Sequence, residues 1–510
     1  MKIIARLSGS WSFSDIAYCL FFVTFYAIFA NVPFWAASHW LGIVLLGWFC
    51  LEYAVIGLLA LFVPRILAVS LLLLVISADM LCGVSKTYYL APTECLANIG
   101  ALHGLPATRL LAVAAVGVLI LLVSSIAAFF PVAAIRGAYR SYAAASLLAF
   151  VVLAVSVDCT VLVRKTGQAP NLLQPAFRDD GLSSHYMNYL WASRYPIIRL
   201  LRSERILGLH RNTLNTTPED DSAVPSAAAL AVSSAGLTAG KKSAGMPNLV
   251  IVLVESWGLA IDSSVRDSLV RPYSNPSLLA QYKVQQGTVP FYGPTVSGEA
   301  RELCGNKMGF HLIVSSTQKL QGCLPDQLAS LGYHSLALHG MDGHFFDRLT
   351  WYRHIGFQEQ WFRDQFRQGG LPDCAGAFVG TCDASIAEWI GQRLAINGTN
   401  PDLVYWVTLN SHLPVPLPSQ LANGVPCSLT PNLSQQPALC SWYQLIANVH
   451  NSVSKLAMTK LARPTIFVIV GDHAPPFSDL SLRNQFSDAV VPYVLLIPRQ
   501  DNQKQTSARR

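Results

Sequence analysis

The hydrophobic positions before residue 165 occur in long runs, whereas those after residue 247 occur in short ones. Stretches of about 20 apolar residues, the length of a membrane-spanning helix, recur in the first part of the chain. Only isolated acidic residues such as Glu52 and Asp79 interrupt them. One such stretch could be a buried core helix, but their succession predicts a multi-pass α-helical membrane domain over residues 1–163. Its five spans are expected at 12–34, 41–63, 66–84, 110–131 and 142–163.

Basic residues in the short loops predict the orientation of these spans, because cytoplasmic loops are enriched in Lys and Arg. The turn at 35–40 has none, and the 85–109 loop has only Lys86 and Arg109. We therefore expect a cytoplasmic N-terminus and an extracytoplasmic location for everything after residue 163. The basic residues on the cytoplasmic side are Lys2, Arg6, Arg65, Arg136 and Arg140.

The short apolar runs of the second half predict β-strands separated by helices. Helical stretches at 384–395 and 441–461 lie between some of them, and this alternation is typical of an α/β domain with a mostly parallel central sheet. We place this domain at residues 247–499. The expected strands are 249–254, 333–338, 403–409, 465–470 and 490–497.

The segment between the two domains, residues 164–246, is interpreted as an interfacial helix followed by a linker. Residues 164–210 carry aromatic, Leu and Arg residues at roughly helical spacing, which suits either a helix on the membrane surface or one packed on the α/β domain. Residues 212–246 are rich in Ser, Ala, Thr and Gly and predict a flexible linker. The polar residues 500–510 predict a disordered tail.

Composition supports a membrane protein with an oxidised outer domain. Charged residues make up 13% of the chain, about half of the 25% typical of globular proteins. The net charge of +7 is modest and no long basic stripe occurs, so we expect no nucleic-acid partner. Six cysteines fall in the outer domain, and we favour disulfides between near neighbours over a zinc site, because no CxxC spacing occurs. These neighbours are Cys304 and Cys323, Cys374 and Cys382, and Cys427 and Cys440.

Carboxylates and an imidazole follow two of the predicted strands. Glu255 ends the run NLVIVLVES, and Asp472 and His473 end the run PTIFVIVGDH. Ligands bind at the carboxyl ends of strands in open α/β sheets. Glu255 alone could pair with an arginine or a helix N-terminus, but together with Asp472 and His473 it predicts a site for zinc or manganese.

The segment GPTVSGEARELCG between these runs offers a nucleophile. A hydroxyl at a helix N-terminus faces N–H groups that favour phosphate, and a divalent cation would activate it. Ser297 could be the N-cap of the helix that starts at SGEA. We therefore favour Thr295 as the nucleophile, with Ser297 as the second candidate.

Further polar side chains follow other strands. LALHGMDGHFFDR contains His339 and Arg348, and TLNSHLP contains His412. Either histidine could be an ordinary packed or exposed residue, and Arg348 could form a surface salt bridge. If they face the site, the histidines could bind substrate and transfer protons, and Arg348 could hold a phosphate oxygen through paired hydrogen bonds.

Taken together, these motifs resemble the membrane-anchored phosphotransferases of the alkaline phosphatase/sulfatase superfamily. That group includes lipoteichoic acid synthases, periplasmic glucan phosphoglycerol transferases and phosphoethanolamine transferases. TVSGEARELCG is similar to the Thr-x-x-Gly…Cys-Gly stretch of the glucan enzymes, and HGMDGHFFDR to a lipoteichoic acid synthase segment that contacts glycerol phosphate. The resemblance implies an alkaline phosphatase-like fold. It also implies a metal held by Glu255, Thr295, Asp472 and His473, and substrate binding by His339, Arg348 and His412.

The activity implied by the resemblance is metal-dependent transfer of a phospholipid head group through a covalent phospho-threonine. The donor would be a membrane phospholipid, the favoured group phosphoglycerol, and the acceptor an envelope glycan or glycolipid outside a bacterial inner membrane. Met341 and Phe346 replace an acid and a tryptophan of the lipoteichoic acid synthases, so phosphoethanolamine transfer to lipid A or polysaccharide stays open. The motifs are also compatible with a phosphatase or sulfatase-like hydrolase, although the sequence lacks the sulfatase motif C/S-x-P-x-R, and with a catalytically inactive scaffold.

Overall fold

The computed structural model describes most of the chain as two compact units, and each is considered by itself. The described residues are 13–45, 47–90, 92–97, 99, 105, 107–129, 138–166, 193–194, 196–197, 224–237, 246–306, 322–374, 376–396, 398–416 and 427–499. The predicted tail at 500–510 and most of the predicted connecting segment lie outside them. The first unit comprises Met1–Ala97 and Ala107–Asn215, and the second Asn98–Pro106 and Thr216–Arg510.

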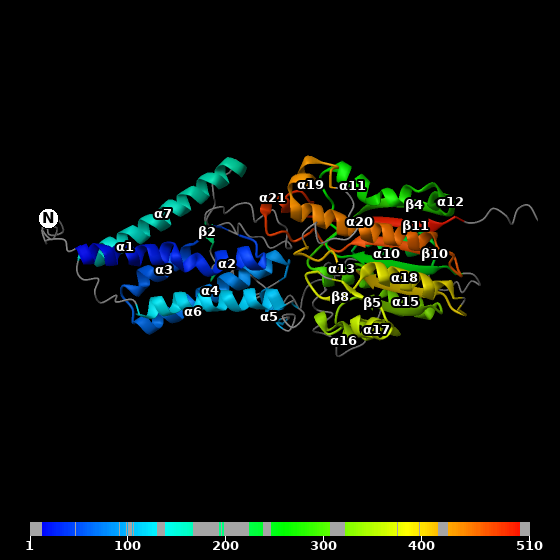
Figure 1. The fold of residues 1–510 in the computed structure, drawn as a ribbon, viewed down its shortest axis with the longest axis horizontal. Coiled ribbons are helices and arrows are strands. Elements are labelled where there is room, and N and C mark those ends of the chain that lie inside the picture. The colour runs from blue at the N-terminus through cyan, green and yellow to red at the C-terminus, as the bar shows by residue number, and fades with distance from the viewer. Residues whose placement is uncertain are drawn as a thin grey trace, which may run out of the picture. The chain divides into compact units, whose positions relative to one another are not determined.

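The first unit is a bundle of apolar helices (Figure 1). Helix α1 packs against α3 and α7, and α4 packs against α3 and α6. The core contains Phe22, Tyr26, Tyr53 and Leu147, all at most 3% exposed. The elements are α1 (Phe13–Ala27), η2 (Phe29–Asn31), α2 (Val32–Leu41), β1 (Phe49–Cys50), α3 (Leu51–Ala60), α4 (Arg65–Thr87), α5 (Pro92–Ala97), α6 (Ala107–Phe129), α7 (Ala138–Thr166) and β2 (Ser193–Arg194).

The multi-pass membrane domain is confirmed, but only four of the five predicted spans are matched by a described segment that is long enough to cross a membrane. Four described segments are long and apolar enough to cross a membrane: Ile16–Leu41, Arg65–Thr87, Ala107–Phe129 and Tyr139–Val157. In place of the span predicted at 41–63, the structure has α3, an apolar helix of 10 residues. Such a helix is about 15 Å long, half the thickness of a hydrocarbon core of about 30 Å.

A buried arginine explains why the chain between α2 and α3 is not helical. Arg194 is 3% exposed, and its Nε and Nη2 donate to Asp79 at 2.8 to 3.0 Å. Its Nη1 donates to the carbonyl oxygens of Gly47 at 2.5 Å and Trp48 at 3.2 Å, and Nη2 also reaches Asn31 Oδ1 at 2.9 Å. Non-helical backbone is tolerated at membrane depth when protein groups satisfy it. Arg194 and Asn31 do this here. Most of the predicted interfacial helix at 164–210 lies outside the described residues.

The second unit is built on one seven-stranded sheet in the order β4-β11-β10-β3-β9-β5-β6 (Figure 1). Strands β10, β3, β9, β5 and β6 are parallel, and β11 is antiparallel to its neighbours β10 and β4. The strands are β3 (Asn248–Val254), β4 (Tyr282–Pro290), β5 (His334–His339), β6 (Glu359–Trp361), β9 (Asp402–Val407), β10 (Thr465–Gly471) and β11 (Val490–Pro498).

The mostly parallel α/β sheet is thus confirmed. Every residue of β3 and β10 is buried, as expected for continuous apolar runs covered on both faces. The edge strands β4 and β6 were not predicted, because their polar residues, such as those of YKVQQGTVP, do not form an apolar run.

Helices and a small hairpin complete the second unit. Helices α18 and α20 pack on each other, and α10 packs on β10, β11 and α13. The elements are α10 (Ala227–Ser234), α11 (Ser263–Val270), η8 (Arg271–Ser274), α12 (Pro276–Gln281), α13 (Thr295–Cys304), α15 (Leu324–Ser330), η9 (Phe345–Asp347), α16 (Arg348–His354), α17 (Arg363–Gln368), β7 (Asp373–Cys374), β8 (Gly380–Thr381), α18 (Asp383–Ala395), α19 (Pro431–Gln435), α20 (Pro437–Met458) and α21 (Leu480–Arg483).

Helix α10 lies inside the range predicted as a flexible linker, and for these residues that prediction is wrong. Ser226 caps the helix by accepting a hydrogen bond from Ala229 N at 3.0 Å. Ala228 N donates to the buried carboxylate of Glu302 at 2.8 Å, and Val224 N donates to the carbonyl of Gly305 at 2.8 Å. A short alanine-rich sequence can therefore form part of the folded domain.

Disulfides join the three predicted near-neighbour pairs, Cys304–Cys323, Cys374–Cys382 and Cys427–Cys440. Disulfides persist in oxidising compartments and are rare in the cytosol. Together with the four apolar helices, they indicate a membrane protein whose C-terminal domain is extracytoplasmic.

Candidate functional site

Glu255 follows β3 and is held there by the side chain of the next residue and by side chains from two other segments. The residue is only 3% exposed. Oε1 accepts a hydrogen bond from Ser256 Oγ at 2.8 Å, and Oε2 accepts one from Thr295 Oγ1 at 3.0 Å. The backbone N–H of Glu255 donates to Thr408 Oγ1 at 2.9 Å. The predicted nucleophile therefore lies directly beside the predicted metal ligand.

Asp472 and His473 follow β10, which is the parallel neighbour of β3. Asp472 Oδ1 accepts hydrogen bonds from Ser256 N at 2.7 Å and His473 N at 2.6 Å. Asp472 Oδ2 is buried and receives no hydrogen bond from the described part of the chain. His473 Nδ1 donates to the carbonyl of Ala474 at 2.9 Å. This leaves Nε2, which lies 3.5 Å from Glu255 Oε1 and 3.3 Å from Asp472 Oδ2.

The protonation of this cluster reflects burial and the two carboxylates. Burial alone would raise the pKa of Glu255, but His412, His473 and the hydrogen bonds from Ser256 and Thr295 lower it to about 2. Burial and the adjacent Glu255 charge raise the pKa of Asp472 well above its usual value. Burial lowers the pKa of His473, so its imidazole is neutral. A positive ion between the carboxylates would relieve their repulsion.

These three residues fit a divalent cation. Their ligand atoms lie within 4.8 Å of one another, and an unpartnered buried oxygen, Asp472 Oδ2, is one of them. Tetrahedral zinc ligands at 2.0–2.1 Å from the ion are separated by about 3.3 Å, close to the separations of His473 Nε2 from both carboxylates. A neutral imidazole whose Nδ1–H is bonded to a carbonyl is also the tautomer that metal sites use.

The helix that carries Thr295 packs directly on the Asp472 segment. Thr295 is the first residue of α13, and Pro294 is its N-cap. The prediction that Ser297 is the N-cap is therefore wrong; the N-cap is Pro294, three residues earlier. Arg301, fully buried in the same helix, donates from Nη2 to the carbonyl of Gly471 at 2.7 Å. This contact joins the helix of the candidate nucleophile to the strand end that carries two of the candidate metal ligands.

Gly298 allows this close packing, because a Cβ at this position would lie 3.1 Å from the Cα and Cβ of Asp472. We expect Gly298→Ala to separate α13 slightly from Asp472 and to lower kcat by about tenfold, less than the roughly 100-fold that a displacement of about 1 Å can cost. Thermal stability should change little, because alanine favours the helix. Steady-state kinetics and thermal unfolding check this. Gly398→Ala is the control, since its added Cβ would meet only ordinary contacts. Equal kinetics for both variants would contradict the prediction.

The two predicted histidines come from neighbouring strands. His339 ends β5 and donates from Nδ1 to the carbonyl of Val407 at 3.0 Å. Burial and the charge of Arg348 lower the pKa of His339 to about 3, so it is neutral and its Nε2 can accept a hydrogen bond. His412 follows β9, is half-buried, and has the ring of Phe378 edge-on at 4.7 Å. Both histidines interact electrostatically with Glu255.

Arg348 is buried and already engaged by a carboxylate. Its Nε and Nη2 donate to Glu299 Oε1 at 3.0 and 2.6 Å, and the hydroxyl of Tyr352 donates to Glu299 Oε2. Glu299 lies on α13, one turn after Thr295. The ion pair therefore connects Arg348 to the helix of the nucleophile, and only Nη1, 3.4 Å from the carbonyl of Phe345, is not bonded to the carboxylate.

Several residues at this edge were missed by sequence analysis. Asp383 is buried, accepts hydrogen bonds from the N–H groups of Leu409 and Asn410 at 2.7 to 3.1 Å, and so shapes the loop before His412. Burial raises the pKa of Asp383 to about 7 despite these bonds. The sequence feature that could have indicated Asp383 is its position directly after Cys382, at the start of a helix. Ser256 lies in the motif NLVIVLVES and Glu299 in GPTVSGEARELCG. In both motifs the expected chemistry was assigned to another residue, Glu255 or Thr295.

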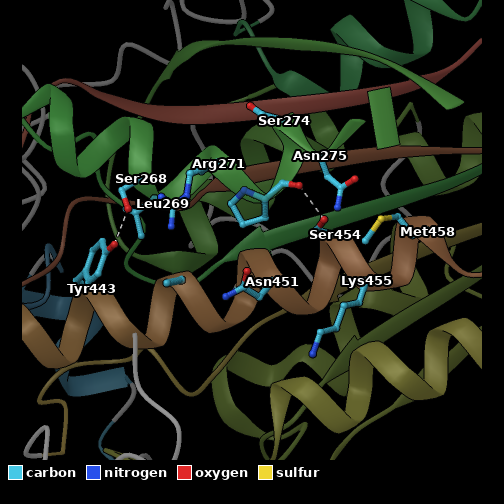
Figure 2. A pocket seen from close by; sticks show the side chains of 12 residues that line it. Ser268, Leu269, Arg271, Ser274, Asn275, Tyr443, Asn451, Ser454, Lys455 and Met458 are labelled. Carbon is cyan, nitrogen blue, oxygen red and sulfur yellow. Dashed lines mark hydrogen bonds between the residues drawn. The ribbon is translucent and has the colours of Figure 1, made fainter. Parts of the chain in front are cut away.

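A separate pocket lies on the second unit between α20 and the segment from α11 to α12 (Figure 2). Arg271 and Lys455 line it, and Tyr443 and Ser268 are hydrogen-bonded across one end at 2.6 Å. None of the predicted site residues lines this pocket. The chemistry is therefore assigned to the cluster at the sheet edge.

A protein-family comparison identifies the second unit. The family model described as Sulfatase matches residues 247–509, just over half of the 510-residue chain. The chain belongs to the sulfatase family. Membership confirms the superfamily resemblance and places this sulfatase-family protein among enzymes that typically use a divalent metal.

One curated relative of this sulfatase-family protein is from Rhizobium meliloti (strain 1021) and bears the name "Putative cyclic beta-1,2-glucan modification protein". It is 26% identical over 255 residues, which are 48% of this chain and 38% of the relative. The chain therefore spans less than two fifths of the relative's length.

Solved structures similar to this sulfatase-family protein include the lipoteichoic acid synthase LtaP of Listeria monocytogenes. It has 16% identity and a TM-score of 0.38 over 50% of this chain and 66% of LtaP. The phosphoglycerol transferase GacH of Streptococcus pyogenes, in complex with sn-glycerol-1-phosphate, has 14% identity and a TM-score of 0.33 over 53% and 73%. The zinc complex of the periplasmic domain of EptC of Escherichia coli has 13% identity and a TM-score of 0.34 over 53% and 77%. These scores are too low to support a conclusion about activity.

Proposed function

We propose that this protein transfers a phosphorylated head group from a membrane phospholipid to an envelope glycan or glycolipid, at the outer face of a bacterial inner membrane. The observation that carries the proposal is the hydrogen bond of 3.0 Å from Thr295 Oγ1 to Glu255. It brings a hydroxyl to the edge of a three-residue metal cluster in a chain with four candidate membrane spans.

In the first step, Thr295 Oγ attacks the phosphorus of the donor. The Oγ–P bond forms, the bond from phosphorus to the glycerol oxygen of diacylglycerol breaks, and diacylglycerol leaves. The Thr295 proton departs toward Glu255 Oε2, to which it is already bonded, and His412 is placed to protonate the leaving oxygen. A zinc or manganese ion held by Glu255, Asp472 and His473 would lower the pKa of the Thr295 hydroxyl and offset phosphate charge.

In the second step, a hydroxyl of the acceptor attacks the phosphorus of the phospho-threonine. The new P–O bond forms while the acceptor hydroxyl gives its proton to His412, the Oγ–P bond breaks, and the proton held at Glu255 returns to Thr295 Oγ, which restores the hydroxyl. Neutral His339 can accept a hydrogen bond from an incoming hydroxyl through Nε2. Arg348 Nη1 is placed to stabilise a phosphate oxygen, while Glu299 fixes the rest of the guanidinium.

Phosphoglycerol is favoured over phosphoethanolamine as the transferred group. An ammonium group needs a carboxylate partner, and the described carboxylates at this edge have other partners. Glu255 and Asp472 belong to the metal cluster, Glu299 binds Arg348, and Asp383 accepts backbone N–H groups. A glycerol hydroxyl can instead donate to a neutral imidazole. The name of the Rhizobium relative favours a glucan as acceptor.

The test uses the full-length protein in vesicles with phosphatidylglycerol or phosphatidylethanolamine labelled in the head group. We expect phosphatidylglycerol to label the protein covalently, a β-glucan to remove the label and become labelled, and a chelator to prevent both. Labelling by phosphatidylethanolamine would instead identify a phosphoethanolamine transferase. Release of the head group to water without glucan labelling would indicate a hydrolase, and no turnover of either lipid would overturn the proposal.

A further inference from the structure

Ser256 has a strained backbone at the centre of the metal cluster. Its φ is 59°, in the left-handed region, and its side chain is fully buried. This conformation is uncommon for a residue other than glycine and is unfavourable for one with a side chain. Such strain persists where surrounding contacts impose it, and it concentrates at functional sites.

The polar groups of Ser256 bind two of the candidate metal ligands. Its Oγ donates to Glu255 Oε1 at 2.8 Å, and its N–H donates to Asp472 Oδ1 at 2.7 Å. Asp472 Oδ2, which receives no hydrogen bond from the described residues, lies 3.3 Å from His473 Nε2. Ser256 therefore sets the orientation of one carboxylate through its side chain and of the other through its backbone.

A tryptophan on α20 supports the strained conformation. Trp442 Nε1 donates to the carbonyl of Ser256 at 2.8 Å, and the ring of Phe486 packs edge-on against Trp442 at 4.7 Å. Both Trp442 and Phe486 are at most 5% exposed. With its N–H, carbonyl and hydroxyl all bonded, Ser256 cannot relax to an ordinary backbone conformation without releasing a ligand.

We propose that Ser256 is a positioning residue that orients Glu255 and Asp472 for binding a divalent cation. The inference rests on the proposed function only in requiring that the cluster binds such an ion. Hydrogen bonds to ligating groups fix their orientation, and losing one typically lowers metal affinity by about 10- to 100-fold. Ser256 itself does not touch the ion or the substrate.

The test is calorimetric titration of the metal-free, full-length protein in detergent with zinc or manganese alone. We expect Ser256→Ala to weaken binding by about 10- to 100-fold. Ser256→Gly should weaken it to a similar extent although glycine adopts the left-handed region without strain, because both lack the hydroxyl. Excess metal should restore much of the kcat of Ser256→Ala.

Ser454→Ala is the matched control, because it removes another buried serine hydroxyl, which donates to the carbonyl of Pro272. Its metal affinity should equal that of the wild type. Affinity of Ser256→Ala within threefold of the wild type, while Glu255→Gln loses binding, would overturn the positioning role and leave the metal site intact. If the wild type binds neither ion, both this inference and the metal-dependent mechanism are wrong.

Discussion

Replacing Thr295 with alanine is expected to lower kcat for head-group transfer by about 10⁴- to 10⁶-fold, as for other catalytic nucleophiles. The Thr295 hydroxyl is the one that donates to the cluster at Glu255 Oε2, and alanine offers no atom that could form the phospho-enzyme. Turnover of labelled phosphatidylglycerol by the full-length protein measures the loss, and mass spectrometry locates the covalent adduct.

Ser297→Ala is the control, since Ser297 lies two residues further along α13 and is 8% exposed. It should change kcat by less than about tenfold and leave the adduct on Thr295. An adduct that persists in Thr295→Ala and disappears in Ser297→Ala would assign the nucleophile to Ser297. Equal metal affinity in all three proteins would show that the loss is chemical.

Arg194→Ala is expected to destabilise the membrane unit by about 3–5 kcal/mol, because it leaves the buried Asp79 carboxylate without its partner. It also deprives the carbonyls of Gly47 and Trp48 of donors. For a unit of this size the midpoint of thermal unfolding in detergent should fall by about 10 °C. The exposed Arg65, at the start of α4, provides the control variant Arg65→Ala, which should change the midpoint little.

A double variant separates loss of the pair from loss of packing. Arg194→Met with Asp79→Leu removes both charges and should recover part of the lost stability, because the desolvated charge is gone. A midpoint as low as that of Arg194→Ala would assign the effect to the backbone carbonyls. Arg194→Ala with wild-type stability would show that the ion pair contributes nothing.

The ion pair also bears on membrane topology. A cytoplasmic N-terminus and an extracytoplasmic C-terminal domain together require an odd number of crossings. Within the described part of the chain, four segments have the necessary length. The N-terminus can be cytoplasmic and the C-terminal domain extracytoplasmic if helix α3 and the chain that precedes it form a fifth crossing. Such a crossing is compatible with a bilayer only where protein groups satisfy the backbone, as Arg194 and Asn31 do.

The strands and the disulfides could be predicted from the sequence, because each depends on residues that are close together in the chain. The strands ending at Glu255 and Gly471 have continuous apolar runs, and their polar ends meet because parallel strands share an edge. The three disulfides join cysteines separated by 8 to 19 positions, in agreement with the preference for near neighbours among the possible pairings.

Features that depend on distant partners were not predictable in the same way. Arg194 lies 115 positions from Asp79, and no local pattern shows that a later segment interrupts the span predicted at 41–63. Arg348 resembled a substrate-binding residue, but its pairing with Glu299 depends on how α13 and α16 pack. The left-handed backbone of Ser256 follows from Trp442, which is 186 positions away.

The docking of α10 determines where an isolated catalytic domain can begin. Glu302 binds Ala228 N on one side and Arg301 on the other, at 2.8 and 2.6 Å, and Arg301 donates to the carbonyl of Gly471, beside the candidate metal ligands. A soluble fragment starting at residue 247, where the family match starts, would expose this polar contact to solvent. Cloning from upstream of Val224 would retain it, so the longer fragment is the better choice for crystallisation.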